Sequence, residues 1–216
     1  MSVRWPRGVR LSVLLLLAAA VAVGAPAVRE PMLRAAGRAL VFDEPVEPAD
    51  VLVVPVDAGG AGVLEAADLV RSGIAGRVAV FADPPDAVDR EFSRRGVRYE
   101  DRAAWSVRHL QLLGVTAIEP TPRPVAGTED VGAVLPDWCA ERQFRSVVVV
   151  STPDHSRRLH RVLQRAMRES QTRVRIRVTR HSGFDPDRWW ETRSGIRTAF
   201  IELQKLLFDL IRHPLS

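Results

Sequence analysis

The sequence predicts an α/β fold: a Rossmann-like, doubly wound and mostly parallel sheet flanked by helices, preceded by one N-terminal transmembrane helix. Short β-branched runs alternate along the chain with longer segments of helical periodicity, as in βαβ units. A charge-free apolar run lies close to the N-terminus. With 216 residues, 46% of them hydrophobic, the chain is long enough for one well-buried domain.

The apolar run covers residues 11–28 and is preceded by three arginines. At about 1.5 Å per residue it would be about 27 Å long, enough to cross a bilayer core. The arginines predict that residues 1–10 are cytoplasmic and that everything after the span is exported. A cleaved signal peptide is the alternative, because Ala25-Pro26-Ala27 resembles a small-residue cleavage site. We therefore expect a single-pass protein of the plasma (inner) membrane with an extracytoplasmic domain.

Residues 29–48 are expected to form a juxtamembrane linker, since three prolines discourage long regular structure there. The α/β domain is expected at 49–212. Continuous β-branched runs predict buried strands, and these lie at 51–56, 77–81, 97–99, 117–119 and 146–150. The run at 173–178 alternates apolar and charged residues, which predicts an edge strand.

Helices are predicted between these strands from capping residues and helical periodicity. They end near residues 71, 96, 113, 143, 167 and 211. Asp86 and Thr128 are the expected N-caps of the second and fourth helices. Glu129 and Asp130 fall in the first turn after Thr128, where the helix dipole favours acids. Pro136 is expected to kink or split that helix.

Composition excludes several classes of site. The net charge is +5, but 30 of the 31 basic residues are arginines with acids spread among them, which argues against a nucleic-acid partner. The single cysteine, Cys139, excludes an internal disulfide and a cysteine-rich zinc site. The signatures of metalloproteases, α/β-hydrolases, NTPases and dinucleotide dehydrogenases are missing. No metal site is predicted.

In a doubly wound sheet, ligands bind beyond the carboxyl ends of the strands. The candidate ligand-binding residues there are Asp57, Gly59, Gly60, Thr128, Thr152, Asp154 and Arg158. His155 opens the helix after the strand at 146–150, so its imidazole would act as general acid or base near a positive helix end. Glu129 and Asp130 are the other predicted catalytic residues. The alternative is that Asp154 caps the helix and His155 is an exposed first-turn residue.

An ordered set of segments over residues 38–212 resembles the SanA/ElyC/YdcF family of envelope-associated bacterial domains. The segments are LVFDEPVEPADVLVVPVDAGG, AADLVRSGIAGRVAVF, GTED, VVVVSTPDHSRRLHRVL and RWWETRSGIRTAFIELQKLL. The resemblance implies a Rossmann-like fold and adds Glu202 and Lys205 of the last segment to the ligand-binding residues. The chain departs from the family in its first two turns and lacks an arginine early in the first helix, where Val63 and Leu64 stand.

The resemblance implies a membrane-anchored extracytoplasmic domain that maintains the cell wall or barrier and binds or processes a small anionic or lipid-linked phosphate ligand. The missing turn glycines and arginine favour an alternative, a non-catalytic scaffold or binding module. The expected partners are the plasma membrane, through the N-terminal helix, and a small anionic ligand. The cofactor is unknown.

Overall fold

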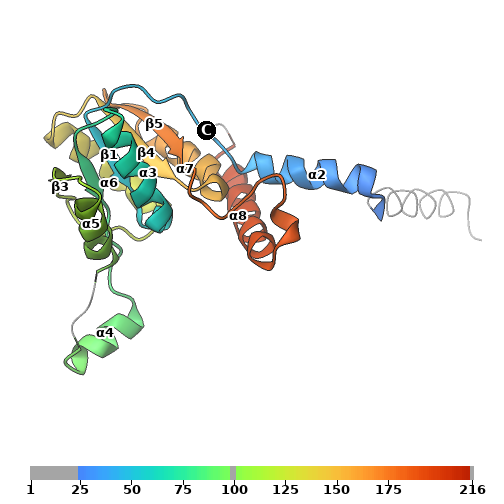
Figure 1. Cartoon of the computed structure of the whole chain (residues 1–216), viewed down its shortest axis with the longest axis horizontal. Coiled ribbons are helices and arrows are strands. Elements are labelled where there is room, and N and C mark those ends of the chain that lie inside the picture. Colours follow the sequence, from blue (N-terminus) through green and yellow to red (C-terminus); the bar gives the residue numbers. More distant parts are fainter. Residues whose placement is uncertain (1–23, 98–100, 215–216) are drawn as a thin grey trace, which may run out of the picture.

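The computed structural model describes residues 24–97 and 101–214. Its centre is a five-stranded sheet of order β3-β2-β1-β4-β5 in which all neighbouring strands are parallel (Figure 1). The strands are β1 (Val51–Val54), β2 (Val78–Val80), β3 (Ile118–Glu119), β4 (Ser146–Ser151) and β5 (Arg173–Val178). This confirms the prediction of a parallel, Rossmann-like α/β sheet, and β5 is an edge strand as expected.

The described residues form seven α-helices and two short 3₁₀ helices. They are α2 (Pro26–Ala39), α3 (Gly59–Arg71), α4 (Ala87–Arg94), α5 (Arg102–Leu112), α6 (Thr128–Glu141), α7 (Pro153–Ala166) and α8 (Arg193–Arg212), with the short 3₁₀ helices η1 (Val56–Ala58) and η2 (Trp189–Glu191). Val51 and Val53 of β1 pack with α6 and α7, whereas Leu52 and Val54 pack with α3 and α5. Side chains alternate along a strand, so each strand serves both cores.

The strand order creates a switch point between β1 and β4. From β1 the chain builds outward through β2 to β3, then returns past β1 and builds β4 and β5 on the other side. The connections that leave β1 and β4 therefore diverge to opposite faces of the sheet. In open α/β sheets the crevice at such a point is where ligands bind.

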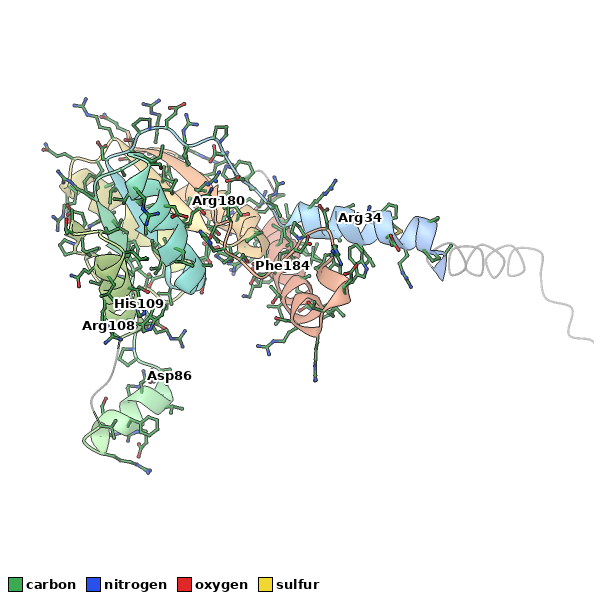
Figure 2. All side chains as sticks on the ribbon, in the orientation of Figure 1. Arg34, Asp86, Arg108, His109, Arg180 and Phe184 are labelled. Atoms are coloured by element: carbon green, nitrogen blue, oxygen red, sulfur yellow. The ribbon has the colours of Figure 1, made fainter. Side chains whose placement is uncertain are left out.

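Helix α8 lies outside the two main cores and packs against α7. A third apolar cluster holds it in place, formed by Leu40, Phe184, Ala199 and Leu206. Figure 2 shows Phe184 in the segment beside α8. At the other side of the molecule α4 projects from the body and buries none of its residues, and its N-cap is Asp86, as predicted (Figure 1).

Some element boundaries differ from expectation. Thr128 is the first residue of α6, with Gly127 as N-cap at a φ of 87°, so the predicted Thr128 cap is wrong. Helix α6 continues through Pro136 to Glu141. Helix α7 begins at Pro153 rather than near 156, since proline is favoured in the first turn of a helix. The predicted strand at 97–99 falls mainly on residues outside the description.

The N-terminal region also requires correction. Helix α2 occupies Pro26–Ala39 and contains Pro31, where a linker without long regular structure was expected. Most of the expected span at 11–28 belongs to residues 1–23, which lie outside the described residues. Within residues 24–97 and 101–214, no helix combines the length and apolarity needed to cross a membrane. The predicted transmembrane anchor, plasma-membrane partner and plasma-membrane location therefore have no support in the described residues.

Candidate functional site

A polar cluster forms where β4 runs into α7. His155 is in the first turn of α7 and is only 5% exposed, so it is not the exposed residue of the alternative interpretation. Its Nε2 lies 3.1 Å from the hydroxyl oxygen of Thr128 in α6. Its Nδ1 lies 2.9 Å from Nη2 of Arg158, one turn further along α7, and 3.4 Å from Oε2 of Glu202 in α8. Residues from three helices therefore meet at this imidazole.

Arg158 connects the members of this group. Its Nη1 donates to the hydroxyl of Thr128 at 2.8 Å, and its Nε and Nη2 both donate to Oε2 of Glu202 at 3.2 Å. Lys205 donates to the other oxygen of Glu202 at 2.7 Å. We refer to Asp57, Thr128, His155, Arg158, Glu202 and Lys205 as the polar cluster.

The surroundings of Glu202 favour its ionised form. Burial alone would raise the pKa of this carboxyl, but the hydrogen-bonding contacts of His155 and Lys205 and the charge of Arg158 outweigh burial and lower the pKa to about 2. The guanidinium of Arg158 can only donate to Nδ1 of His155, whereas the carboxylate of Glu202, 3.4 Å from the same nitrogen, can only accept from it, so the donor and acceptor roles of the ring depend on its tautomer. Nε2 faces the hydroxyl of Thr128 and the carboxylate of Asp57, whose Oδ2 lies 3.6 Å away.

Thr128, His155 and Glu202 follow the order of a hydroxyl–histidine–carboxylate relay. In this chain, however, the guanidinium of Arg158 hydrogen-bonds all three. The three side chains are also buried, and the open members of the polar cluster are Asp57 and Lys205, whose side chains are 52% and 50% exposed. The geometry therefore suits bracing of the carboxyl edge of the sheet better than attack by Thr128 on a substrate.

The other predicted site residues have different surroundings. Asp130 accepts from Arg123 and from the backbone N–H of Ala126, contacts that lower the pKa of its carboxyl to about 2. The side chain of Glu129 is 70% exposed and pairs with Arg165. Neither acid contacts His155 in the described hydrogen bonds and ion pairs, so the structure does not bring the three predicted catalytic residues together.

Thr152 and Asp154 lie at the start of α7. Thr152 is the N-cap residue, and its carbonyl accepts from the backbone N–H of His155 at 3.2 Å. Asp154 is in the first turn, so it does not cap the helix. Burial raises the pKa of its carboxyl, against the lowering effects of hydrogen bonds and of nearby His155.

A pocket of about 410 Å³ opens at the carboxyl ends of β1 and β2, between the first turns of α3 and α5. We call it the β1–β2 pocket. Its walls are formed by Pro55, Val56, Gly59, Gly60, Val80, Phe81, Asp101, Arg102, Ala103, Trp105 and Ser106. The sequence identified the glycines but missed Trp105, because an aromatic residue in an amphipathic helix gives no sign that it faces a pocket.

Two glycines shape the entrance to α3. Gly59 has a φ of 52°, which residues with a side chain rarely adopt, and it both ends η1 and forms the first residue of α3. Gly62, one turn further on, lies so close to β1 that a Cβ there would overlap Ala58 and approach Val54. This close contact brings the first turn of α3 to the carboxyl end of β1, and Gly62 was not singled out from the sequence.

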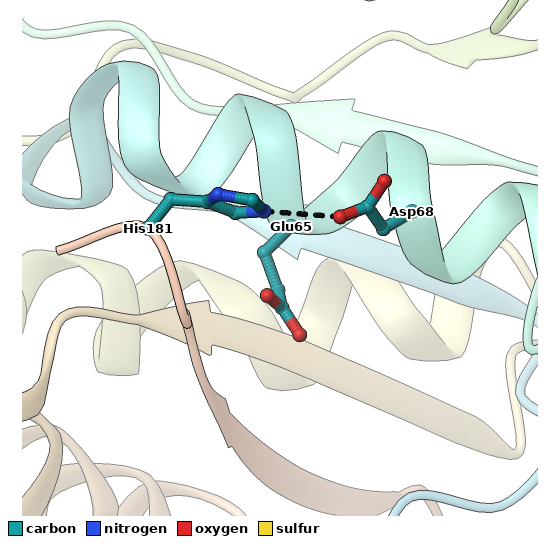
Figure 3. A group of neighbouring side chains, drawn as sticks. All are labelled: Glu65, Asp68 and His181. Carbon is teal, nitrogen blue, oxygen red and sulfur yellow. Dashed lines mark hydrogen bonds and ion pairs between the residues drawn. The ribbon is translucent and has the colours of Figure 1, made fainter.

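A separate group of potential metal ligands consists of Glu65, Asp68 and His181. One ligand atom of each residue lies within 4.8 Å of those of the other two. Figure 3 shows His181 directed at Asp68, at 3.0 Å, while the carboxylate of Glu65 points away from that pair. Both oxygens of the buried Glu65 accept from arginines, Oε1 from Arg177 and Oε2 from Arg180. Arginines therefore already neutralise the most buried acid of this group, which indicates an ion-pair network.

Comparison with known proteins gives fold neighbours only. No family model matches the chain, and no curated protein matches it. A universal stress protein from Archaeoglobus fulgidus is 14% identical, with a TM-score of 0.38 over 60% of this chain and 93% of that one. A universal stress protein solved in complex with cAMP is 19% identical, with a TM-score of 0.34 over 63% of this chain and 100% of that one.

The resemblance to the SanA/ElyC/YdcF family is therefore wrong as an identification, since no family model and no curated protein matches the chain. Of the segments that suggested it, VVVVSTPDHSRRLHRVL forms a strand and the helix that follows it, β4 and α7, a unit common to doubly wound sheets. The envelope function, its lipid-linked phosphate ligand and the scaffold alternative depended on that resemblance and are dropped with it.

Proposed function

We propose that this chain is a small-molecule-binding domain whose ligand occupies the β1–β2 pocket. The observation that carries the proposal is a pocket of about 410 Å³ beyond the carboxyl ends of two adjacent parallel strands. Open α/β sheets bind ligands beyond the carboxyl ends of their strands, and this pocket lies there, one strand away from the β1–β4 switch point; its volume falls within the range of small-molecule sites. Apolar side chains form most of the wall, and Asp101, Arg102 and Ser106 supply a few polar groups.

The aromatic wall favours a ligand with a flat ring. Trp105 is stacked on His109, with ring centroids 3.8 Å apart and an interplanar angle of 28°. This stack fixes the indole while leaving it part-exposed. Flat rings gain stacking energy as well as burial on such a surface, so a heteroaromatic compound such as a nucleoside fits the pocket better than an open-chain metabolite.

The polar cluster has a separate role in this proposal. Asp57 lies in η1 between Val56 and Gly59, which both line the pocket, and its carboxylate approaches His155. We therefore propose that His155 positions η1, and through it the rim of the pocket, rather than touching the ligand. Gly59 and Gly60 keep the ligand-binding role expected from the sequence.

Thermal melting of the full chain tests the proposal, with adenosine, AMP and cAMP as ring-bearing probes and ribose 5-phosphate as the ring-free control. A probe at about 100 times its Kd stabilises by about 2.7 kcal/mol, which raises Tm by about 5 °C or more. We expect a shift with at least one ring-bearing probe and none with the control. A cooperative melt that none of the three shifts, or a shift with ribose 5-phosphate alone, contradicts the proposal.

A matched pair of variants locates the site. Gly60 lies opposite the indole of Trp105, and its φ is not positive. A leucine at this position, Gly60→Leu, therefore fills the pocket without backbone strain. Gly76 has open space around its Cβ position and lies outside the pocket, so Gly76→Leu is the control. We expect Gly60→Leu to lose the ligand-induced shift and Gly76→Leu to keep it. If both variants keep the shift, the ligand binds elsewhere.

A further inference from the structure

The β1–β2 pocket has a buried part that contains one hydroxyl. Its buried residues, which we call the floor, are Pro55, Val80, Phe81 and Ser106. The first three are apolar, so the hydroxyl of Ser106 is the polar side-chain group of the floor. Ser106 is 9% exposed, compared with 44% for Trp105, the preceding residue of α5. The indole therefore forms an open wall of the pocket, and the serine lies deeper.

The other polar side chains of the pocket already have partners. The carboxylate of Asp101 caps α5 and accepts from the backbone N–H of Ala103 at 2.8 Å. The guanidinium of Arg102 lies 3.6 Å from the carboxylate of Asp83, and its side chain is 76% exposed. Among the described residues, by contrast, no hydrogen bond involves the hydroxyl of Ser106. The polar group with the least access to bulk solvent is thus the one left without a partner.

The helix does not satisfy this hydroxyl either. A serine inside a helix often donates to the carbonyl four residues earlier, as Ser93 of α4 does to Asp89 at 3.0 Å. Ser106 makes no such bond. Buried hydroxyls are normally hydrogen-bonded, and one without a partner is destabilising. Alanine would also favour the helix more, so the serine serves neither the helix nor the packing of the floor.

The surroundings of the hydroxyl define the group that fits it. Successive residues of a helix are about 100° apart, so Trp105 and Ser106 present adjoining sides of α5 to the same pocket. A flat ring with its face on the indole therefore turns an edge toward the floor. A hydrocarbon edge would leave the hydroxyl unpaired, and a sugar or phosphate would be buried among apolar side chains without enough partners.

We propose that Ser106 is the specificity-determining residue of the β1–β2 pocket, and that it selects a flat heterocycle with a ring nitrogen, an amino group or a carbonyl group at the edge that enters the floor. This selection rests on the proposed function, because it takes place in the same pocket. A hydroxyl can donate or accept a hydrogen bond, so each of these groups can pair with it. The rest of the ligand extends toward the mouth, where the exposed Arg102 lies.

Isothermal titration calorimetry of the full chain tests the role of Ser106. The probe is whichever of adenosine, AMP and cAMP gives the largest shift in Tm. Ser106→Ala should bind it about 10-fold or more weakly, because a polar group of the ring is then buried without a partner. Without probe, Ser106→Ala should melt at or above the wild-type temperature, because the hydroxyl has no partner within the described fold.

Ser93→Ala is the matched control. Ser93 is also a helical serine, but it is exposed and does not line the pocket, so this variant should bind the probe like the wild type. If no probe binds the wild type, the proposed function and the selection by Ser106 both fail. If Ser106→Ala binds the probe as tightly as the wild type, the selection fails while ligand binding stands. A Ser106→Ala chain that melts well below the wild type without probe also overturns the selection.

Competition for the bound probe tests the class of ligand. Adenine and indene are flat bicyclic rings of similar size, but only adenine carries nitrogen atoms at its edge. A site built to hydrogen-bond its ligand rejects an analogue that lacks the polar group. We expect adenine to displace the probe from the wild type at a concentration about 10-fold or more below that of indene, and this preference to shrink in Ser106→Ala. Equal displacement by the two rings, or displacement by neither, overturns the proposal.

Discussion

Arg158 of α7 donates two hydrogen bonds, from Nε and Nη2, to a single oxygen of Glu202 in α8, each at 3.2 Å. Seven residues further along α8, Asp209 accepts from Arg161 and Arg165 of the same helix α7. Two inward acids of α8 thus face three arginines of α7. Arg158 and Glu202, which the sequence analysis predicted as ligand-binding residues, therefore attach α8 to the rest of the domain.

Removing the charge of Glu202 should weaken this attachment. Glu202→Gln keeps the shape of the side chain but leaves Arg158 and Lys205 without their carboxylate. Breaking a buried ion pair from one side costs about 3–5 kcal/mol. We expect a loss of that order in the free energy of unfolding, measured by urea denaturation.

Glu129→Gln is the matched control for this measurement. Glu129 also pairs with an arginine of α7, Arg165, but its side chain is 70% exposed, compared with 9% for Glu202. Exposed pairs contribute about 0–1 kcal/mol. Equal losses in the two Glu→Gln variants would show that Glu202 does not hold α8.

The same carboxyl predicts a pH dependence. The pKa of Glu202 falls from 4.5 to about 2 in the folded chain. A carboxyl with a lowered folded pKa contributes stability above its unfolded pKa and loses it as the pH falls through the folded value. At 1.36 kcal/mol per pKa unit the contribution is about 3 kcal/mol.

Urea unfolding of wild type and Glu202→Gln across acidic pH isolates this contribution from that of other acids. The difference in the free energy of unfolding between wild type and Glu202→Gln should be constant near neutral pH and should shrink as the pH falls from 4.5 toward 2. A difference that does not change over this window would mean that Glu202 titrates normally in the folded chain.

The sequence predicted the sheet because buried parallel strands are continuous β-branched runs, as in β4. It also directed attention to His155 and Arg158 at the end of β4. Their burial was not predictable, because Glu202, which helps to cover them, lies 47 residues beyond His155. The β1–β2 pocket escaped prediction for a similar reason, since Trp105 reaches it only through the packing of α5 on α3.

Alanine substitutions at Gly62 and Gly60 of α3 should change the free energy of unfolding in opposite directions. A Cβ at Gly62 would overlap Ala58, so Gly62→Ala forces the helix away from β1, at a cost of about 1–3 kcal/mol. A Cβ at Gly60 meets only the indole of Trp105 at 3.4 Å, and alanine favours a helix more than glycine by up to about 1 kcal/mol. Urea denaturation of both variants measures the contrast. If Gly62→Ala were as stable as Gly60→Ala, α3 would not pack on β1 as closely as described.

The hydroxyl of Thr128 should contribute more to stability than that of another buried threonine. Thr128 accepts from Nη1 of Arg158 and contacts Nε2 of His155, so Thr128→Val leaves two buried polar groups without this partner. The hydroxyl of Thr172 has only uncharged partners, the carbonyl of Phe144 at 2.7 Å and the thiol of Cys139. An unsatisfied buried polar group costs about 1–3 kcal/mol, more when it is charged. Urea denaturation should therefore show a larger loss in the free energy of unfolding for Thr128→Val than for Thr172→Val. Equal losses would mean that the contacts of Thr128 with Arg158 and His155 do not stabilise the polar cluster.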